Sequence, residues 1–385
     1  MARATSAKED RQPQRPVPLE IIAQYAPTHN KDHAGWWQDL GLLFSRFLDF
    51  GKYDVHEQYQ YLLFLYHTLV PSLGPYPNQW KSVITMTGLP IEYSLNFQQG
   101  TRPLIRIGFE PVSDQSGSPV DPFNQFPVSE LVNVLARLRL PGFDSALFHH
   151  FAHDFTVSAQ ETARLGDIGP IRTQGAFGFD LKGSGEISTK GYSFMRLKHM
   201  ATRTPISELI LKSAKKLQPH MDCMEALSIL DEYMASTGGY TEFTFLAWDY
   251  VPVGSSRLKI YGVHPEATLA RAQEMWTVGN RFNDPTTRTG WDLLRRLWTL
   301  MKINEHVVAM PENFDDGADA SAHGNVPPLI WNYEIQPGSA RPVPKLYFPV
   351  HGVNDLTVAR GLSEFFASLG WKDQAETYVD GLARL

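Results

Sequence analysis

The stretch Arg257-Leu-Lys259-Ile-Tyr261 is predicted to be a β-strand in which two cations and a phenol alternate with aliphatic residues. Side chains two residues apart share one face of a strand, so Arg257, Lys259 and Tyr261 should point the same way. The pattern recurs in Lys190-Gly-Tyr192, in Lys345-Leu-Tyr347 and, with the cation alone, in Leu104-Ile-Arg106-Ile-Gly108. If the four segments belong to one sheet, their cations and tyrosines gather on a common surface.

Such a surface favours a multiply charged anion, because clustered cations repel one another without one. Arg and Lys are the usual phosphate binders, so diphosphate is the first expectation. The π faces of the tyrosines attract organic cations when water is excluded. The same surface would therefore hold a diphosphate and shelter a carbocation left when it departs. The competing interpretation is that each cation reaches from a sheet edge into water, which is common for one strand but less so for four with the same spacing.

Composition restricts the class of protein. The 385 residues carry a formal net charge of -6, and the basic residues form no run, which argues against a nucleic-acid-binding protein. A single cysteine, Cys223, excludes an internal disulfide and fits a reducing compartment. We expect it to be a buried core residue.

The N-terminal region and the most apolar run carry no targeting or membrane signal. Residues 1–18 are rich in Arg, Gln, Pro and Ala but lack the apolar segment of a secretory signal, and we expect a disordered arm there. The run Tyr61–Val70 is too short to span a bilayer and stops at Pro71. These features predict a soluble, cytoplasmic protein that does not contact membranes.

The chain shows a recurrent order of two helices followed by strands. The predicted helices are 33–50 and 56–70, 128–138 and 145–154, 206–217 and 223–234, 265–277 and 289–303, and 355–369 and 372–385. The predicted strands are 82–87, 91–97 and 103–111, then 176–181 and 186–200, 241–251 and 257–263, and 329–335 and 344–350. Lys182-Gly-Ser-Gly185 is predicted as a hairpin turn, rather than as part of a dinucleotide-binding loop. The repeated ααββ units indicate an α+β barrel, with antiparallel strands inside and helices outside.

The predicted barrel has an opening. Hairpins follow four of the five helix pairs, and a sheet built from them alone keeps two unpaired edges, which are costly unless they are covered. We therefore expect residues 19–385 to form one barrel domain from which a last strand pair is absent, or whose gap is covered in another way.

The chain resembles the fungal aromatic prenyltransferases of the dimethylallyltryptophan synthase family over nearly its whole length from about residue 20. The resemblance rests on Thr87-Gly-Leu-Pro-Ile-Glu92-Tyr-Ser-Leu-Asn96 and on the four strand segments quoted above. Trp36-Trp37, Gly74-Pro-Tyr76-Pro77 and Gly370-Trp371 resemble the family as well. It implies an ABBA barrel of ten antiparallel strands, with the reaction at its centre.

The resemblance also implies an activity and the residues that perform it. The family transfers a dimethylallyl group from its diphosphate to an aromatic acceptor, most often an indole, without needing a metal or another cofactor. The diphosphate would be held by Arg106, Lys190, Arg257, Lys259 and Lys345. The shield of the allyl cation would be formed by Tyr192, Tyr261 and Tyr347. Glu92 would accept a hydrogen bond from the indole N–H, which strengthens as the ring becomes cationic.

Three departures from the family pattern bear on the acceptor. Members that act at C4 of free tryptophan carry a lysine base where this chain is aligned at Phe177. They also carry an arginine for the amino-acid carboxylate where this chain has Thr244. Both differences favour a tryptophan-containing cyclic dipeptide or another neutral aromatic. The third departure is that the family continues into a last hairpin with two more shielding tyrosines.

Two possible metal motifs have simpler interpretations. Asp315-Asp-Gly-Ala-Asp319 matches the DDxxD motif of magnesium-dependent prenyl synthases, but it lies among Gly, Pro and Asn, where a loop is favoured over a helix. His149 and His153 are one helical turn apart, a workable zinc spacing, but no further ligand pattern accompanies them. No metal site is therefore expected.

Two rivals to the prenyltransferase interpretation stay open. One is a non-catalytic protein that binds an isoprenoid or nucleotide diphosphate, and the other is a magnesium-dependent terpene-type synthase that uses Asp315, Asp316 and Asp319. Free tryptophan and phenols stay open as acceptors. The protein is expected to act as a monomer or homodimer.

Overall fold

The computed structural model describes residues 17–385 except 167, 171, 238–241, 308–327 and 351. Its centre is one antiparallel sheet in the order β1-β2-β3-β4-β5-β6-β9-β10. These strands are β1 (Ile91–Asn96), β2 (Leu104–Phe109), β3 (Gly175–Leu181), β4 (Ile187–Phe194), β5 (Glu242–Asp249), β6 (Leu258–His264), β9 (Leu329–Ile335) and β10 (Val343–Tyr347). Two short strands, β7 (Glu266–Ala267) and β8 (His306–Val307), pair separately.

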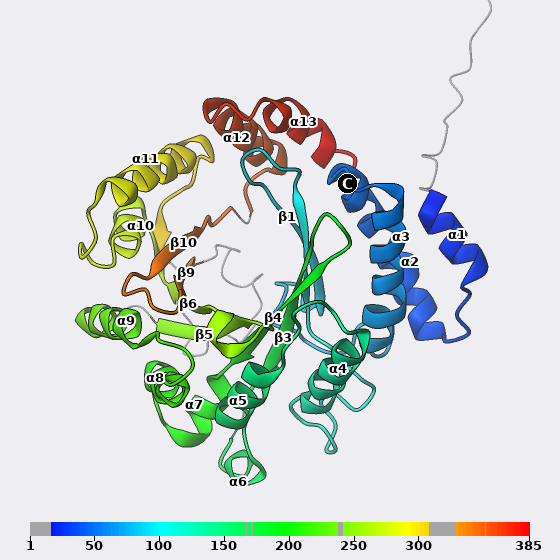
Figure 1. The fold of residues 1–385 in the computed structure, drawn as a ribbon, viewed down its shortest axis with the longest axis horizontal. Coiled ribbons are helices and arrows are strands. Elements are labelled where there is room, and N and C mark those ends of the chain that lie inside the picture. The colour runs from blue at the N-terminus through cyan, green and yellow to red at the C-terminus, as the bar shows by residue number, and fades with distance from the viewer. Residues whose placement is uncertain (1–16, 167, 171, 238–241, 308–327, 351) are drawn as a thin grey trace, which may run out of the picture.

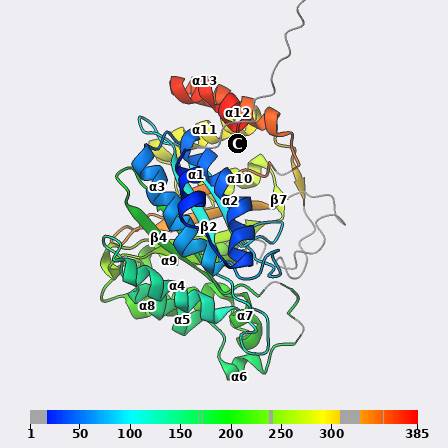
Figure 2. The same ribbon diagram turned by 90° about the vertical axis from the view of Figure 1, so that its right-hand side faces the viewer.

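Helices surround the curled sheet on its outside (Figure 1). They are α1 (Val17–Tyr25), α2 (Lys31–Phe50), α3 (Val55–Phe64), α4 (Gln125–Leu138), α5 (Ala146–Phe155), α6 (Ala159–Thr162), α7 (Arg196–Thr202), α8 (Ile206–Leu217), α9 (Met224–Ser236), α10 (Leu269–Trp276), α11 (Pro285–Leu300), α12 (Asp355–Ser368) and α13 (Lys372–Leu382). A π-helical turn, Leu65–Leu69, continues α3. The predicted α+β architecture, with strands inside and helices outside, is therefore present (Figure 2).

Local signals fix where several helices begin. The side chain of Asn30 accepts hydrogen bonds from the backbone at the start of α2, and Asp284 does so for α11. Asp54 and Glu57 form a capping box at the start of α3. Each of these satisfies backbone N–H groups that a helix leaves without an internal partner.

The two faces of the sheet differ in chemistry. The outer face, toward the helices, is aromatic and buried: Phe177, Phe179, Trp331 and Tyr333 are each at most 2% exposed. In β3 and β9 these residues alternate with Asp180, Asn332 and Glu334, which therefore point to the inner face. Burial of the aromatic face against the helices supplies the main hydrophobic core, and the polar positions are left facing inward.

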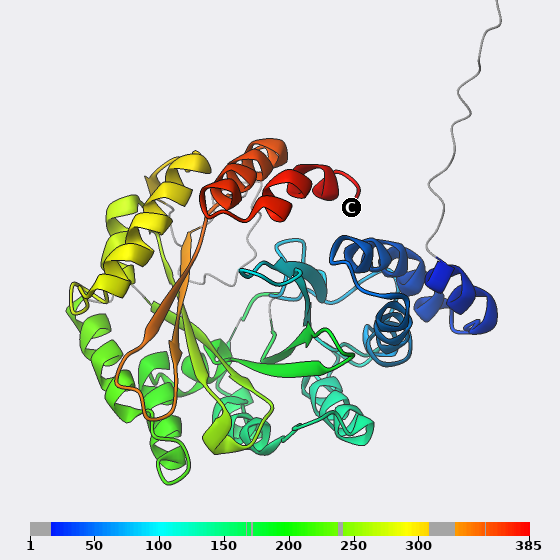
Figure 3. The ribbon, with the colours of Figure 1, turned by 45° about the horizontal axis from the view of Figure 1, so that its top comes forward.

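The described sheet is open between β1 and β10, whereas the ring of helices is closed by contacts between α13 and the end of α2. β1 and β10 are the ends of the strand order within the described part of the chain. The last helix, α13, lies against the end of α2, where the rings of Phe50 and Tyr378 are 6.4 Å apart and Lys52 Nζ lies 2.6 Å from Asp373 Oδ2. Figure 3 shows α12 and α13 beside the β1–β2 hairpin. Phe97, in that hairpin, contacts Phe366 and Tyr378.

Three predicted boundaries are wrong. Residues 82–87 form a loop instead of a strand, because Ser82 N bonds to Gly88 O and the segment folds back on itself. The strand predicted over 186–200 ends at Phe194, and α7 follows, since Leu197 and Ala201, four residues apart, pack into a small second core. Val17 and Pro18, assigned to a disordered arm, begin α1, while residues 1–16 lie outside the described residues.

Among the described residues, no helix combines the length and apolar character needed to cross a membrane.

Candidate active site

The structure brings the five predicted cations together on the inner face of the sheet. Arg106, Lys190, Lys259 and Lys345 lie on four different strands, and Arg257 directly precedes β6. The strand register places the cations on successive strands of the curled sheet. Lys190 pairs with Asp249, Ala247 with Lys259, and Asn332 with Lys345. The cations are close enough for Arg106, Lys190 and Lys259 to lower the pKa of Lys345.

Three carboxylates that the sequence analysis missed lie among these cations. Asp180 Oδ2 is 2.5 Å from Lys190 Nζ, and Asp180 Oδ1 is 3.2 Å from Arg106 Nε. Glu334 Oε2 is 2.8 Å from Arg257 Nη1 and 3.4 Å from Lys259 Nζ. Asp249 Oδ2 lies 2.9 Å from Arg257 Nε. Alternation along β3, β5 and β9 could have placed these acids on the inner face, but only the strand register shows which cation each one meets.

Lys345 is the cation without a carboxylate partner among the described residues. Its Nζ lies 4.7 Å from the centre of the Tyr347 ring, a cation–π contact. Its side chain is accessible on the inner face, yet desolvation by the surrounding protein, together with Arg106 and Lys259, lowers its pKa to about 8. This lysine is therefore poised to gain most from an added anion.

The three predicted tyrosines form a continuous row beside the cations. The ring centres of Tyr192 and Tyr261 are 6.3 Å apart, and those of Tyr261 and Tyr347 are 6.2 Å apart. Phe245 stacks on Tyr261 at 4.1 Å and extends the aromatic surface. Burial raises the pKa of Tyr192, Tyr261 and Tyr347, so all three remain neutral phenols near neutral pH.

Glu92 lies on the inner face of β1, across two glycines from Lys190. The register runs Glu92, Gly108, Gly178, Lys190 along neighbouring strands. A Cβ added at Gly108 would lie 2.8 Å from Glu92 Cγ, and one added at Gly178 would lie 3.1 Å from the Tyr192 hydroxyl. The space above these glycines is therefore taken up by the side chains of Glu92 and Tyr192, which a Cβ at either position would displace. Desolvation by the surrounding protein raises the pKa of Glu92, although its side chain is accessible from the inner face.

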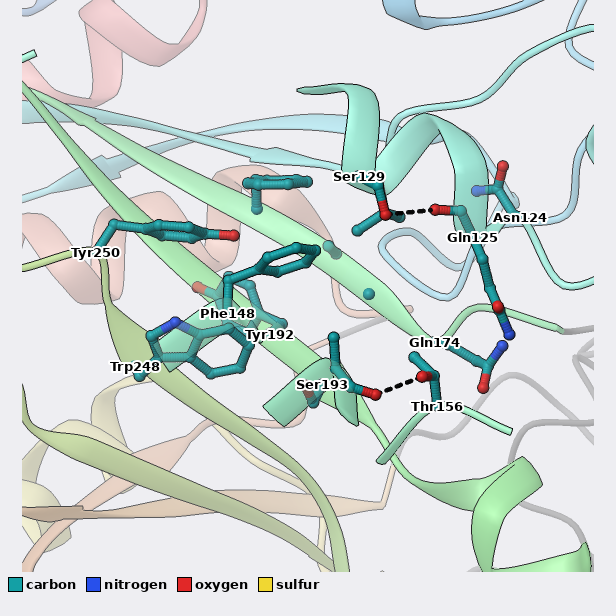
Figure 4. A pocket seen from close by; sticks show the side chains of 15 residues that line it. Asn124, Gln125, Ser129, Phe148, Thr156, Gln174, Tyr192, Ser193, Trp248 and Tyr250 are labelled. Atoms are coloured by element: carbon teal, nitrogen blue, oxygen red, sulfur yellow. Dashed lines mark hydrogen bonds between the residues drawn. The ribbon is translucent and has the colours of Figure 1, made fainter. Parts of the chain in front are cut away.

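The expected place of Phe177 on the reaction surface is wrong by one residue. Its side chain is on the outer face, 1% exposed, and stacks against Tyr250. It lines a cavity of about 90 Å³ beneath α4 and α5, where Phe148, Trp248 and Tyr250 lie on one side and Gln125 and Gln174 on the other (Figure 4). Because the side-chain period of a strand is two, the inner-face positions of β3 are Ala176 and Gly178. Neither residue can act as a base.

Thr244, the second position used to judge the acceptor, is at an irregularity in β5. The register shifts between Phe243 and Phe245, and Thr244 Oγ1 donates a hydrogen bond to the backbone oxygen of Tyr261 at 3.3 Å. Its hydroxyl is thus used to hold β5 against β6, and it carries no charge for a carboxylate.

The possible metal motifs have varied outcomes. Asp315, Asp316 and Asp319 lie outside the described residues. His149 and His153 lie on α5, and among the described residues no group of three or more His, Cys, Asp or Glu side chains is arranged to hold a metal ion.

The turn predicted at Gly183 and Gly185 is confirmed, with Gly185 at φ +79°. Cys223 is buried, as predicted.

Comparisons with known proteins identify relatives over most of the chain. A family model described as tryptophan dimethylallyltransferase matches residues 32–381. Echinulin prenyltransferase 1 of Aspergillus ruber is 49% identical over 94% of this chain and 87% of its own length. Deoxybrevianamide E synthase of Aspergillus versicolor is 45% identical over 100% of this chain and 89% of its own.

Solved structures support the same relationship. The crystal structure of NotF in complex with brevianamide F and DMSPP superposes with a TM-score of 0.86 at 43% identity, and the match covers 96% of this chain and 90% of NotF. The curled antiparallel sheet ringed by helices is thus an ABBA-type barrel, as the resemblance implied, although its main sheet has eight strands among the described residues where the resemblance implied ten.

Proposed function

Because the chain belongs to the tryptophan dimethylallyltransferase family and is an aromatic prenyltransferase, we propose that it transfers a dimethylallyl group to the indole of a tryptophan-containing cyclic dipeptide. The donor is dimethylallyl diphosphate. The observation that carries the proposal is the inner face of the sheet, which combines five cations, a row of three tyrosines and one desolvated carboxyl group. NotF, which is similar over nearly the whole chain, was solved with brevianamide F bound.

The five cations are proposed to hold the diphosphate and to promote its departure. As the C–O bond of the donor breaks, the electron pair leaves with the diphosphate and negative charge grows on its oxygens. Cations already in place stabilise that charge without moving, so they favour the transition state over the ground state. Arg257 retains Nη2, and Arg106 retains both terminal nitrogens, as donors beyond the ion pairs described above.

The tyrosines are proposed to protect the dimethylallyl cation formed in this step. Their π faces attract the cation, and neutral phenols are poor nucleophiles that do not trap it. The raised pKa of Tyr192, Tyr261 and Tyr347 keeps them neutral. The π electrons of the indole then attack the cation, a C–C bond forms, and the ring loses one proton to restore aromaticity.

Glu92 is proposed to bind and activate the acceptor. An ionised carboxylate accepts a hydrogen bond from the indole N–H, and this bond strengthens as the ring becomes cationic during attack. Gly108 and Gly178 lack the Cβ atoms that would displace Glu92 and Tyr192, so the carboxylate and the phenol both stay on the inner face, where the indole would bind.

Free tryptophan is disfavoured as the acceptor, although Phe177 itself does not face the reaction surface. The inner-face positions of β3, Ala176 and Gly178, supply no base, and Thr244 supplies no cation for a free carboxylate. A cyclic dipeptide has no such carboxylate. The relatives named for echinulin and deoxybrevianamide E fit the same choice.

We further propose that neither metal nor cofactor is required. Five protein cations offset by three carboxylates supply the positive charge that magnesium supplies in other prenyl synthases. Loss of activity in EDTA, restored by magnesium, would contradict this part of the proposal.

An acceptor panel tests the substrate assignment. The protein would be assayed with dimethylallyl diphosphate and, in parallel, brevianamide F, free L-tryptophan and a simple phenol, with kcat/KM measured for each. The proposal predicts the highest kcat/KM for the cyclic dipeptide. A higher value for free tryptophan or the phenol would contradict it, and binding of the donor without product from any acceptor would favour a carrier.

A further inference from the structure

We infer that Asp180 and Glu334 are positioning residues that set how tightly the diphosphate site holds its anion. This inference rests on the proposed function, because it assigns the anion to the inner-face cations. The carboxylates hold the cations in two bridged pairs and compete with the anion for them. They thereby limit the affinity for the diphosphate product that must leave after each turnover.

Asp180 bridges two cations from neighbouring strands. Its two oxygens divide between Lys190 Nζ at 2.5 Å and Arg106 Nε at 3.2 Å. All three side chains are shielded, with 9% exposure for Lys190, 13% for Asp180 and 32% for Arg106. Since screening by water is weak at such a position, the charge of Asp180 acts strongly on both cations.

Glu334 forms the corresponding bridge on the next part of the sheet. Its Oε2 contacts Arg257 Nη1 at 2.8 Å and Lys259 Nζ at 3.4 Å, and Gln336 Nε2 donates to its other oxygen at 2.6 Å. Asp249 holds the remaining edge of Arg257 through Nε. Arg257 is therefore fixed from two sides, which leaves its Nη2 group to face an anion.

The charge count shows why these carboxylates matter for affinity. Five cations and three carboxylates leave a net charge of +2 at the site. Neutralising one carboxylate raises this to +3 without removing any group that would contact the anion. A diphosphate carries more than two negative charges, so it should bind more tightly to the variant.

This expectation is opposite to that of a purely structural role. If the carboxylates only supported the fold or oriented the cations, their loss would weaken anion binding. If they act as competing counter-charges, their loss strengthens anion binding even while it lowers the stability of the ligand-free protein, because a buried cation loses its partner. The two roles thus predict changes of opposite sign in the same measurement.

The test is calorimetric titration of inorganic pyrophosphate into the wild-type chain, Asp180→Asn, Glu334→Gln and the control Asp373→Asn. Asp373 pairs with Lys52 on the surface, 63% exposed, so its substitution removes the same charge away from the site. We expect Kd for pyrophosphate to fall about tenfold in the first two variants and to stay unchanged in the control. The inhibition constant of pyrophosphate in the prenylation assay should fall in parallel, with kcat reduced and KM for the donor lowered.

The titration distinguishes failure of the diphosphate site from failure of the role given to Asp180 and Glu334. No pyrophosphate binding by the wild-type chain would remove the anion from this site and overturn the proposed function. Wild-type binding with equal or weaker binding by either variant that folds would overturn this inference alone. Thermal melting with and without pyrophosphate checks folding, and because the two bridges are separate, either folded variant suffices to decide the sign.

Discussion

At the residue scale, Glu92 is the most informative single side chain. Replacing it with Gln keeps its size but removes the charge that stabilises a developing indole cation. We expect kcat/KM for the indole acceptor to fall by about 10²–10³-fold. Pyrophosphate affinity measured by calorimetry should be unchanged, because Glu92 lies across Gly108 and Gly178 from Lys190. Turnover at the wild-type rate would remove Glu92 from its assigned role.

The raised pKa of Glu92 gives a second readout at the same residue. Desolvation favours the protonated form, so the carboxylate is lost at a higher pH than for an ordinary glutamate. The acidic limb of the pH profile of kcat/KM should therefore lie above the usual range of a glutamate and be absent from the residual activity of Glu92→Gln. An identical acidic limb in the variant would assign it to another group.

From the pKa of Lys345 we predict how diphosphate binding depends on pH. Its pKa is lowered to about 8, so it is cationic below that pH and neutral above it. Affinity for pyrophosphate should decrease as the pH rises through about 8. Lys345→Arg, which keeps its charge, should move this loss to higher pH. If the arginine variant loses affinity over the same pH range, another group controls the binding.

Single residues also show where prediction from sequence stopped. The five cations and three tyrosines were found because their spacing repeats the strand period. Asp180 and Glu334 were missed because an acid on a strand has no meaning until its neighbours across the sheet are known. Phe177 was misplaced for a related reason: an error of one residue moves a side chain to the opposite face.

At the scale of elements, the sheet is best understood as a surface with two functions. The outer face carries aromatic rings that stabilise the fold, and the inner face carries the chemistry. Glycines on the two faces provide matched probes, because adding one methyl group should disturb stability on one face and activity on the other.

The outer-face probe is Gly191. A Cβ there would lie 2.4 Å from the Trp248 ring, which is packed against Phe151 of α5. Gly191→Ala should therefore lower the free energy of unfolding by about 1–3 kcal/mol through overpacking. Denaturant unfolding measures this loss. A stability equal to that of the wild type would contradict the prediction, because it would show that the Trp248 ring can shift to accommodate the added methyl group.

The inner-face probe is Gly108. A Cβ there would meet the flexible side chain of Glu92 at 2.8 Å, so the carboxylate can move aside with little effect on folding. Gly108→Ala should keep its stability but lose about tenfold or more in kcat/KM for the acceptor, with donor binding retained. A large loss of stability with normal activity would contradict this assignment of the two faces.

The elements themselves were largely predictable, and the errors have local causes. Long amphipathic helices such as α2 and α11 follow the helical period and carry Asn30 and Asp284 as N-terminal caps. The loop at residues 82–87 looked like a strand because its apolar residues alternate. Its conformation instead depends on Ser82, whose hydroxyl bonds to Glu110 in a distant segment, a contact that local sequence does not reveal.

At the scale of the whole molecule, Glu110 joins segments that are distant in sequence. It is fully buried, accepts hydrogen bonds from Ser82 and Thr173 at 2.5 and 2.9 Å, and accepts one from Asn124 at the start of α4 at 3.1 Å. Burial raises its pKa to about 7 from an ordinary 4.5. The folded protein therefore binds this proton more tightly than the unfolded chain.

The raised pKa of Glu110 makes the stability of the fold depend on pH, and the linkage between proton binding and folding gives the sign of this dependence. Stability from this group is complete below about pH 4.5 and is lost as the pH rises through about 7, by about 1–3 kcal/mol. Glu110→Gln, which does not titrate, should remove this part of the pH dependence. Chemical unfolding of both proteins between pH 5 and about 8 measures the difference, and parallel curves would show that Glu110 stays ionised.

The architecture of the molecule was predictable as repeated helix pairs and hairpins, but its closure was not. The contacts of α13 with the end of α2 join residues more than three hundred positions apart, such as Lys52 and Asp373. No sequence period specifies such pairs. The same closure arranges the strands around the inner face on which the proposed reaction depends.

The most direct test of the central claim is product formation by the intact chain. The protein would be incubated with dimethylallyl diphosphate and brevianamide F in the presence of EDTA, and the products analysed by mass spectrometry. We predict a product in which one dimethylallyl group replaces one hydrogen of the acceptor, with release of one diphosphate per product. Absence of that product from folded protein that binds pyrophosphate would contradict the claim that the inner face is a prenyl-transfer site.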